Sequence, residues 1–201
     1  MEVTRALRQL FPKHVFVATY NNLPNSWCNE ETITKLKELK YRTNEGNLST
    51  EDTYVLERPE FKNIKDAAQK ELDGMFKDFV PDEKCKLRIT QSWVNITEGQ
   101  GYHPFHPHPN SFMSGVIYFK TSDDDAIWFK DHQNLISSRV QLVQDSAVKH
   151  PVQAGQIIMF DSDMAHGVMP SDRKEERISL AFNTFPTGTI GDTKGLTELR
   201  L

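Results

Sequence analysis

Three of the seven histidines in this chain lie in one short tract, His103-Pro104-Phe105-His106-Pro107-His108. Imidazole nitrogen is a good ligand for Fe, Zn, Ni and Cu, so the tract is a candidate metal site. In an extended segment, residues two positions apart point to the same face. We therefore expect His106 and His108 to converge on one ion, and His103 to lie at the rim of the site.

Prolines hold this tract in an extended conformation. Pro104, Pro107 and Pro109 fix φ, so the neighbouring imidazoles lose little conformational freedom when an ion binds. A His-x-His pair does not establish a metal site by itself, because many such pairs are surface histidines or histidines with ordinary hydrogen bonds. A metal site therefore needs a further ligand from another part of the chain.

His166 is the candidate for that ligand, because it follows a run, residues 155–160, with the composition of a buried strand. Eleven residues after His166 begins a strand whose two faces differ. One face is apolar and the other small and polar, with the sequence Arg177-Ile178-Ser179-Leu180-Ala181-Phe182-Asn183. The pattern predicts either a half-solvated strand or a cavity wall on which Arg177 clamps a carboxylate through two hydrogen bonds.

The elements that must position these residues change along the chain. Up to about Pro81 the signals are mainly helical: one helix is predicted from an Asn29 cap through Lys40, and a second over residues 62–79. A strand is predicted over residues 14–20. The segments 44–57 and 121–125 are interpreted as lids or surface loops.

From Lys86 onward the pattern is typical of short strands separated by turns, which predicts an antiparallel sandwich or jelly roll. The N-terminal helices would cover the outer face of one sheet. Trp93 and Trp128 are expected in the core. The predicted strands cover residues 87–96, 112–119, 126–129, 139–148, 156–160 and 177–185.

Length and charge limit the alternatives. A chain of 201 residues predicts one domain over 1–201, with a mainly helical part (1–81) and a β core (86–186). The net charge of -4 gives no strong nucleic-acid signal. Two separate cysteines, no export signal and no apolar run of bilayer length predict a cytoplasmic protein without a membrane partner.

Together these motifs resemble the 2-oxoglutarate/Fe(II)-dependent oxygenases, whose signature is His-x-Asp/Glu, a distal His, and Arg-x-Ser farther on. The likeness is greatest to a small bacterial and phage branch with an HxH motif. The resemblance implies an α+β, mainly β fold with a double-stranded β-helix (jelly roll, cupin-like) core and N-terminal helices packed on one sheet. The matching segments are Ser92 to Asn95, His106 to Pro109, Ser114 to Tyr118 and Arg177 to Asn183.

The resemblance also implies roles for individual residues. His106, His108 and His166 would hold Fe(II) as the catalytic centre, although His108 stands where the family has a carboxylate. Asp161 or Asp163 is the alternative source of that carboxylate. The predicted contacts to the cosubstrate 2-oxoglutarate are Arg177 on its distal carboxylate, with Ser179, Tyr118, Asn95 and Asn183 around it.

The implied activity is a dioxygenase reaction that uses O₂, hydroxylates a substrate and releases succinate and CO₂. The substrate stays open between a small molecule, a protein side chain and a nucleobase, as does assembly into a homo-oligomer. One alternative is a cupin-like module that binds metal without this catalysis, and another is a β-sandwich interaction protein with chance histidines. Arg177 discriminates between them, because a structural metal site has no need of a buried cation.

Overall fold

The computed structural model describes residues 13–21, 27–80, 84–130 and 147–201. The helices are α1 (Glu30–Lys37) and α2 (Lys62–Phe79), with 3₁₀ turns at Val55–Glu57 and Pro59–Phe61. The N-terminal part also holds three strands, β1 (Val15–Thr19), β2 (Tyr41–Asn44) and β3 (Asn47–Thr50). The remaining strands are β4 (Cys85–Thr97), β5 (His103–His106), β6 (Met113–Lys120), β7 (Ala126–Lys130), β8 (Ala147–Pro151), β9 (Gln156–Asp161), β10 (Ala165–Val168), β11 (Arg177–Ile190) and β12 (Leu199–Arg200).

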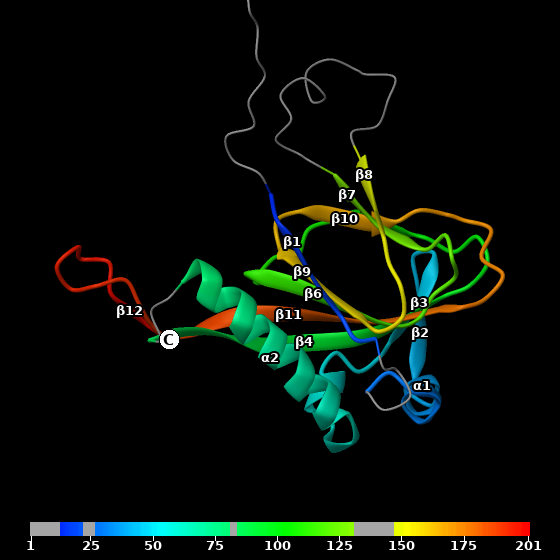
Figure 1. Ribbon diagram of the computed structural model, residues 1–201, viewed down its shortest axis with the longest axis horizontal. Coiled ribbons are helices and arrows are strands. Elements are labelled where there is room, and N and C mark those ends of the chain that lie inside the picture. Colours follow the sequence, from blue (N-terminus) through cyan, green and yellow to red (C-terminus); the bar gives the residue numbers. More distant parts are fainter. Residues whose placement is uncertain (1–12, 22–26, 81–83, 131–146) are drawn as a thin grey trace, which may run out of the picture.

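The strands form two sheets that face each other (Figure 1). The large sheet has the order β1-β9-β6-β11-β4-β3-β2, with β12 paired to β11, and the small sheet has the order β5-β10-β7-β8. Strands β4 to β11 contribute four members to each sheet, and the chain crosses repeatedly from one sheet to the other. This is the topology of a double-stranded β-helix, so the predicted fold class is confirmed.

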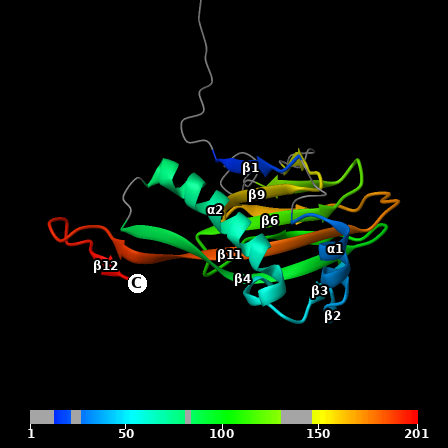
Figure 2. The same ribbon diagram turned by 60° about the horizontal axis from the view of Figure 1, so that its bottom comes forward.

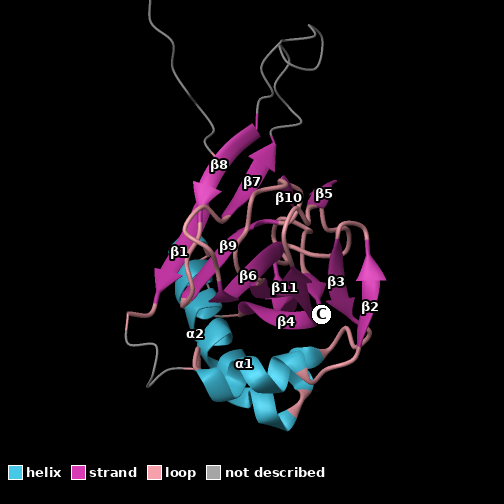
Figure 3. Cartoon of the chain, turned by 90° about the vertical axis from the view of Figure 1, so that its right-hand side faces the viewer, coloured by secondary structure: helices cyan, strands magenta, loops and turns pink. Residues whose placement is uncertain are grey.

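The large sheet is covered on both faces. Helices α1 and α2 lie on one side of it, whereas the small sheet lies on the other side (Figure 3). Alternation of side chains along each strand separates the two environments. Among the side chains that pack toward the helices are Val94, Ile96, Ile117, Phe119, Ile157, Met159, Ile178, Leu180 and Phe182. Those that pack toward the small sheet include Val116, Tyr118, Ile158 and Phe160.

Both predicted helices are present. The Asn29 side chain accepts a hydrogen bond from the Thr32 N–H at 2.9 Å, as its predicted capping role requires. Helix α1 ends at Lys37, earlier than expected, and the Tyr41 hydroxyl donates to the Leu36 carbonyl in its last turn. No helix in the described ranges has the combined length and apolar character of a membrane span.

The interpretation of residues 44–57 as a lid or surface loop is wrong for residues 44–50. Asn44 and Asn47 face each other across a β2–β3 hairpin, and Gly46 adopts a φ of +77° in its turn. Strand β3 then pairs with β4, so the hairpin extends the large sheet. No alternation of apolar residues indicated these strands, because β2 has no fully buried side chain.

The central strands are longer than predicted. β4 and β11 pair from Arg177 opposite Thr97 to Gly188 opposite Cys85, and they extend beyond the body of the sandwich toward β12 (Figure 2). Of the strand predicted over 139–148, residues 139–146 lie outside the described residues. The other predicted strands match β1, β6, β7 and β9 with shifts of one residue or less at either end.

Gly115 provides a test of packing under the helices. A Cβ at this position would lie 2.1 Å from Cζ of Phe182, which is 1% exposed and cannot move aside. We expect Gly115→Ala to lower the free energy of unfolding by about 1–3 kcal/mol in urea titrations. Gly74→Ala is the matched control, since nothing lies within 4 Å of its added Cβ and helix propensity predicts a gain of about 1 kcal/mol. Unchanged stability in Gly115→Ala would contradict this description of the core.

Candidate metal centre

The three histidines predicted as ligands come together between the two sheets. His106 ends β5 and lies directly opposite His166 of β10. His108 follows two residues later, and its backbone N–H donates to the Ser162 carbonyl at 2.8 Å. One ligand atom from each ring lies within 4.8 Å of the others, and the Nε2 atoms of His108 and His166 are 3.2 Å apart. A single ion can therefore contact all three rings.

Backbone carbonyls orient two of these rings. His106 Nδ1 lies 2.8 Å from the Pro104 carbonyl, and His166 Nδ1 lies 3.0 Å from the Met164 carbonyl. A carbonyl accepts only from a protonated nitrogen, so Nδ1 carries the proton and the Nε2 lone pair is free for a metal. Burial, with the nearby imidazoles, lowers the pKa of His108 to about 4. Burial likewise lowers the pKa of His166 to about 3, so both rings are neutral at neutral pH.

The other candidate ligands lie outside this cluster. His103 contacts the His106 ring at 4.4 Å between centroids, but its Nδ1 faces Asn47 Nδ2 at 3.4 Å. Asp161 and Asp163 are half-exposed or more, and both pair with Lys13 at the surface. Neither aspartate takes the place of the carboxylate that the family usually has. The donor set is therefore three imidazoles, which fits Fe(II) and also Zn, Ni and Cu.

Arg177 lies in the same pocket as the three histidines, together with Ser179 and Ala181 of the polar face of β11. Its guanidinium donates from Nη1 to the Ala126 carbonyl at 2.8 Å and from Nη2 to the Tyr118 hydroxyl at 3.4 Å. The side chain is 2% exposed, and no carboxylate of the described residues forms an ion pair with it. A buried cation without an anion is unfavourable, so the pocket favours an anionic ligand.

The remaining predicted cosubstrate contacts divide into two groups. Asn95 lines the pocket on β4, where it lies opposite Ser179. Tyr118 and Asn183 are not among the residues that line it. Tyr118 is fully buried against Arg177, with the guanidinium carbon 5.0 Å from its ring centroid. Burial raises the pKa of Tyr118 to about 12, so it stays an uncharged hydroxyl that orients the arginine.

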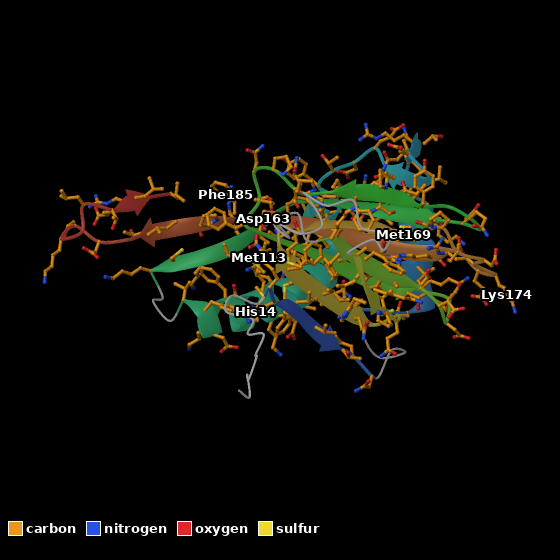
Figure 4. All side chains as sticks on the ribbon, turned by 90° about the horizontal axis from the view of Figure 1, so that it is seen from above. His14, Met113, Asp163, Met169, Lys174 and Phe185 are labelled. Atoms are coloured by element: carbon orange, nitrogen blue, oxygen red, sulfur yellow. The ribbon has the colours of Figure 1, made fainter. Side chains whose placement is uncertain are left out.

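Asn183 belongs to a buried chain of hydrogen bonds that leads to His108. Its Oδ1 accepts from Ser114 Oγ at 3.2 Å, and Ser114 Oγ lies 2.8 Å from Ser162 Oγ. Ser162 Oγ also bonds to Ser111 at 2.8 Å, and the Ser162 carbonyl holds the His108 backbone. Met113 and Asp163, next to this network in sequence, lie near each other at one end of the sandwich (Figure 4). Asn183 thus supports the loop that carries His108.

A buried ion pair that the sequence did not indicate lies next to Ala126, the residue whose carbonyl accepts from Arg177. Arg173 Nε donates to Asp125 Oδ1 at 2.7 Å, with side chains 2% and 0% exposed. The same guanidinium donates to the carbonyls of Gly99, Gly101 and Met169. Met169 and Lys174 lie at the end of the molecule away from Asp163 (Figure 4). Residues 121–125 form a surface turn with Asp123 and Asp124 exposed, which agrees with the surface-loop interpretation. The buried Asp125 anchors this turn beside Ala126, whose carbonyl orients Arg177.

The prediction that Trp93 lies in the core is wrong. Trp93 lines the pocket instead of the core, and its ring centroid lies 5.5 Å from that of His108. A tryptophan on a strand carries no local signal that separates a core position from a pocket wall.

Comparisons with known proteins agree with this geometry. Residues 91–183, a little under half of the chain, match a family model described as "Putative 2OG-Fe(II) oxygenase". This segment, which holds the β core of the chain, is similar to the 2OG-Fe(II) oxygenases. The predicted resemblance is confirmed, and the matched segment contains His106, His108, His166 and Arg177. No curated protein sequence matches the chain significantly.

Solved structures with the same fold have diverged far in sequence. HygX from Streptomyces hygroscopicus, with nickel and 2-oxoglutarate bound, has a TM-score of 0.63 and 12% identity, over 86% of this chain and 82% of that one. SnoN, a non-heme epimerase of nogalamycin biosynthesis, has a TM-score of 0.62 and 10% identity over 88% and 80%. A prolyl-4-hydroxylase from Pseudomonas putida has a TM-score of 0.56 and 15% identity over 86% and 92%. At such identities the likeness concerns the fold alone.

Replacement of single histidines tests the metal centre. We expect His166→Ala and His108→Ala each to weaken Ni(II) binding by more than about 100-fold, as measured by calorimetry. Removal of a metal ligand should lower the affinity more than removal of a residue that only supports a ligand. His103→Ala is the control from the same pocket and should change the affinity by less than about threefold. Equal losses in all three variants would contradict the assignment of the ligands.

The Arg173–Asp125 pair makes a separate prediction about stability. Arg173→Met leaves the Asp125 carboxylate buried without its cation, so the free energy of unfolding should fall by about 3–5 kcal/mol. Arg173→Met combined with Asp125→Asn should recover part of that loss in the same urea titration. A double variant that is no more stable than Arg173→Met would argue against a coupled pair.

Proposed function

We propose that this protein is a 2-oxoglutarate- and Fe(II)-dependent dioxygenase that hydroxylates its substrate. The observation that carries the proposal is the shared pocket of a three-histidine cluster and a buried arginine that forms no ion pair with any carboxylate of the described residues. The three-histidine cluster suits a divalent metal ion. The buried arginine suits a dianion that extends from the metal ion to the guanidinium. 2-Oxoglutarate has the required carboxylate at each end.

In this proposal His106, His108 and His166 hold Fe(II) through their Nε2 atoms. The carbonyls of Pro104 and Met164 keep two rings in the tautomer that leaves Nε2 free. Because the three ligands are neutral imidazoles, the protein adds no negative charge next to the ion. An anionic chelator is thereby favoured more than in a site that already contains a carboxylate.

Arg177 binds the distal carboxylate of 2-oxoglutarate, with the Ser179 hydroxyl beside it on the same face of β11. The bonds from Arg177 to Ala126 and Tyr118 leave further N–H groups for a bidentate contact. When bound, Fe(II) and 2-oxoglutarate supply the O₂-dependent oxidation that yields succinate, CO₂ and a hydroxylated product. The protein contributes orientation and an interior from which bulk water is excluded.

A metal-binding module without catalysis is the competing proposal. It accounts for the histidines but not for Arg177, whose burial without an anion would be a permanent cost. The oxygenase proposal gives that cation a function.

The proposal also covers domain organisation, cellular location and substrate class. We infer one domain over 1–201 and a cytoplasmic location, since Cys28 and Cys85 form no disulfide bond. A homo-oligomer is compatible with the chain. A small molecule, a protein side chain or a nucleobase remains a candidate substrate; among similar folds, one HygX structure holds hygromycin B and another protein is a prolyl-4-hydroxylase.

Anaerobic spectroscopy tests the proposal directly. Fe(II) and 2-oxoglutarate together should give the weak visible charge-transfer band of a chelated cosubstrate, and Fe(II) alone should not. Tight binding of Zn(II) without any such band on addition of Fe(II) and 2-oxoglutarate would refute the oxygenase proposal.

Arg177→Leu separates the clamp from the metal site. Loss of charge-assisted hydrogen bonds should weaken 2-oxoglutarate binding by about 10- to 100-fold in titrations of that band. Ni(II) affinity should stay within about threefold of wild type, because Arg177 contacts none of the ligands. Equal loss of metal and 2-oxoglutarate affinity would point instead to a folding role for Arg177.

A further inference from the structure

Two side-chain oxygens in the histidine pocket lack partners. Asn47 Oδ1 and Asn95 Oδ1 are buried and accept no hydrogen bond from the described part of the chain. Both asparagines line the pocket that also contains the three-histidine cluster and Arg177. Buried carbonyl oxygens nearly always have a donor, so two unsatisfied acceptors in one pocket indicate a ligand group that donates.

The β2–β3 hairpin brings Asn47 to this place. Ser49 of β3 lies opposite Asn95 of β4, so Asn47 is delivered to the same end of the sheet. The turn of the hairpin is fixed, because the Tyr102 N–H donates to the Gly46 carbonyl at 2.9 Å. A Cβ on Gly46 would lie 2.5 Å from the Tyr102 carbonyl oxygen, which shows how closely the two segments approach. Asn47 is therefore part of a firmly held wall.

His103 is the hydrogen-bond partner of the Asn47 amide nitrogen. Asn47 Nδ2 lies 3.4 Å from His103 Nδ1, and His103 is also a wall of the pocket. With its nitrogen directed to His103, the amide leaves Oδ1 for whatever enters the pocket. His103 thus has a place beside the metal ligands without belonging to their cluster.

The chemistry of these atoms excludes 2-oxoglutarate as their partner. Ionised carboxylates and a ketone only accept hydrogen bonds, so they cannot satisfy two carbonyl oxygens. Asn47 also lies outside residues 91–183, the segment that matches the oxygenase family and carries the histidines and Arg177. A residue from outside the shared core is well placed to select the substrate, which differs among such enzymes.

We propose that Asn47, Asn95 and His103 form a substrate subsite in which the two asparagine oxygens accept hydrogen bonds from a hydroxyl or amino group. This inference rests on the proposed oxygenase function and narrows its substrate to molecules or side chains that carry such a donor near the oxidised carbon. A pure hydrocarbon substrate would leave both oxygens unsatisfied.

Binding of small probes tests the subsite without any need for turnover. The protein is loaded with Zn(II) and 2-oxoglutarate, and probe affinities are measured by saturation-transfer NMR. The probes form two pairs of similar shape, cyclohexanol against fluorocyclohexane and cyclohexylamine against methylcyclohexane. We expect wild type to bind the donor-bearing member of each pair about two- to tenfold more tightly, which is the worth of a net hydrogen bond.

Three variants assign that preference to Asn47. Asn47→Leu should abolish it, whereas Asn47→Asp, which keeps an acceptor oxygen, should retain it. Asn44→Leu is the matched control: Asn44 faces Asn47 across the hairpin but does not line the pocket, so the preference should persist. Urea titration confirms that each variant is folded.

Two results would overturn the subsite: no preference for donors in wild type, including no binding of any probe, or a preference that survives Asn47→Leu. The outcome is separate from the test of the oxygenase. If wild type prefers donor-bearing probes but shows no charge-transfer band, the subsite is supported and the dioxygenase proposal fails. If the band appears but wild type shows no preference for donors, the dioxygenase proposal is supported and the subsite fails.

Discussion

Residues 177–184 of strand β11 are buried on both faces, and the placement of the site depends on that constraint. It pairs with β4 on one side and β6 on the other, so its backbone is fixed at the centre of the large sheet. Ile178, Leu180 and Phe182 pack under the helices. Arg177 and Ser179 must then face the small sheet, where the histidines lie. A slip of one residue would exchange the two faces and bury the guanidinium among the helices.

Each end of the pocket is held by buried polar contacts that do not include the proposed ligand. At the metal end, Asn183 and three serines connect β11 and β6 to the backbone of His108. At the carboxylate end, Arg173 and Asp125 join three loops next to the carbonyl that orients Arg177. Such support reduces the reorganisation that binding requires, which is how a rigid scaffold improves a site. Polar residues far apart in sequence thus do most of the positioning.

Sequence patterns predicted the parts whose signal is local. The helix over 62–79, the strand of alternating residues from Arg177 and the pairing of His106 with His108 all follow from periodicity. The hairpin at 41–50 was missed because its strands carry no alternation of apolar residues. Arg173 and Asp125 were missed because each lies in a polar segment that looks solvent-exposed, and only the folded chain brings them together. Asn183 was predicted on the correct face of β11, but its register opposite Ser114 gives it a protein partner instead.

Replacement of the usual carboxylate by His108 makes the cosubstrate the main source of negative charge at the ion. The central claim is therefore that one anion spans the histidine cluster and Arg177. A crystal structure of the protein with Ni(II) and 2-oxoglutarate tests it most directly. We expect the ion on the Nε2 atoms of His106, His108 and His166, and the distal carboxylate of 2-oxoglutarate on Arg177. An ion bound elsewhere, or 2-oxoglutarate bound without contact to Arg177, would contradict the claim.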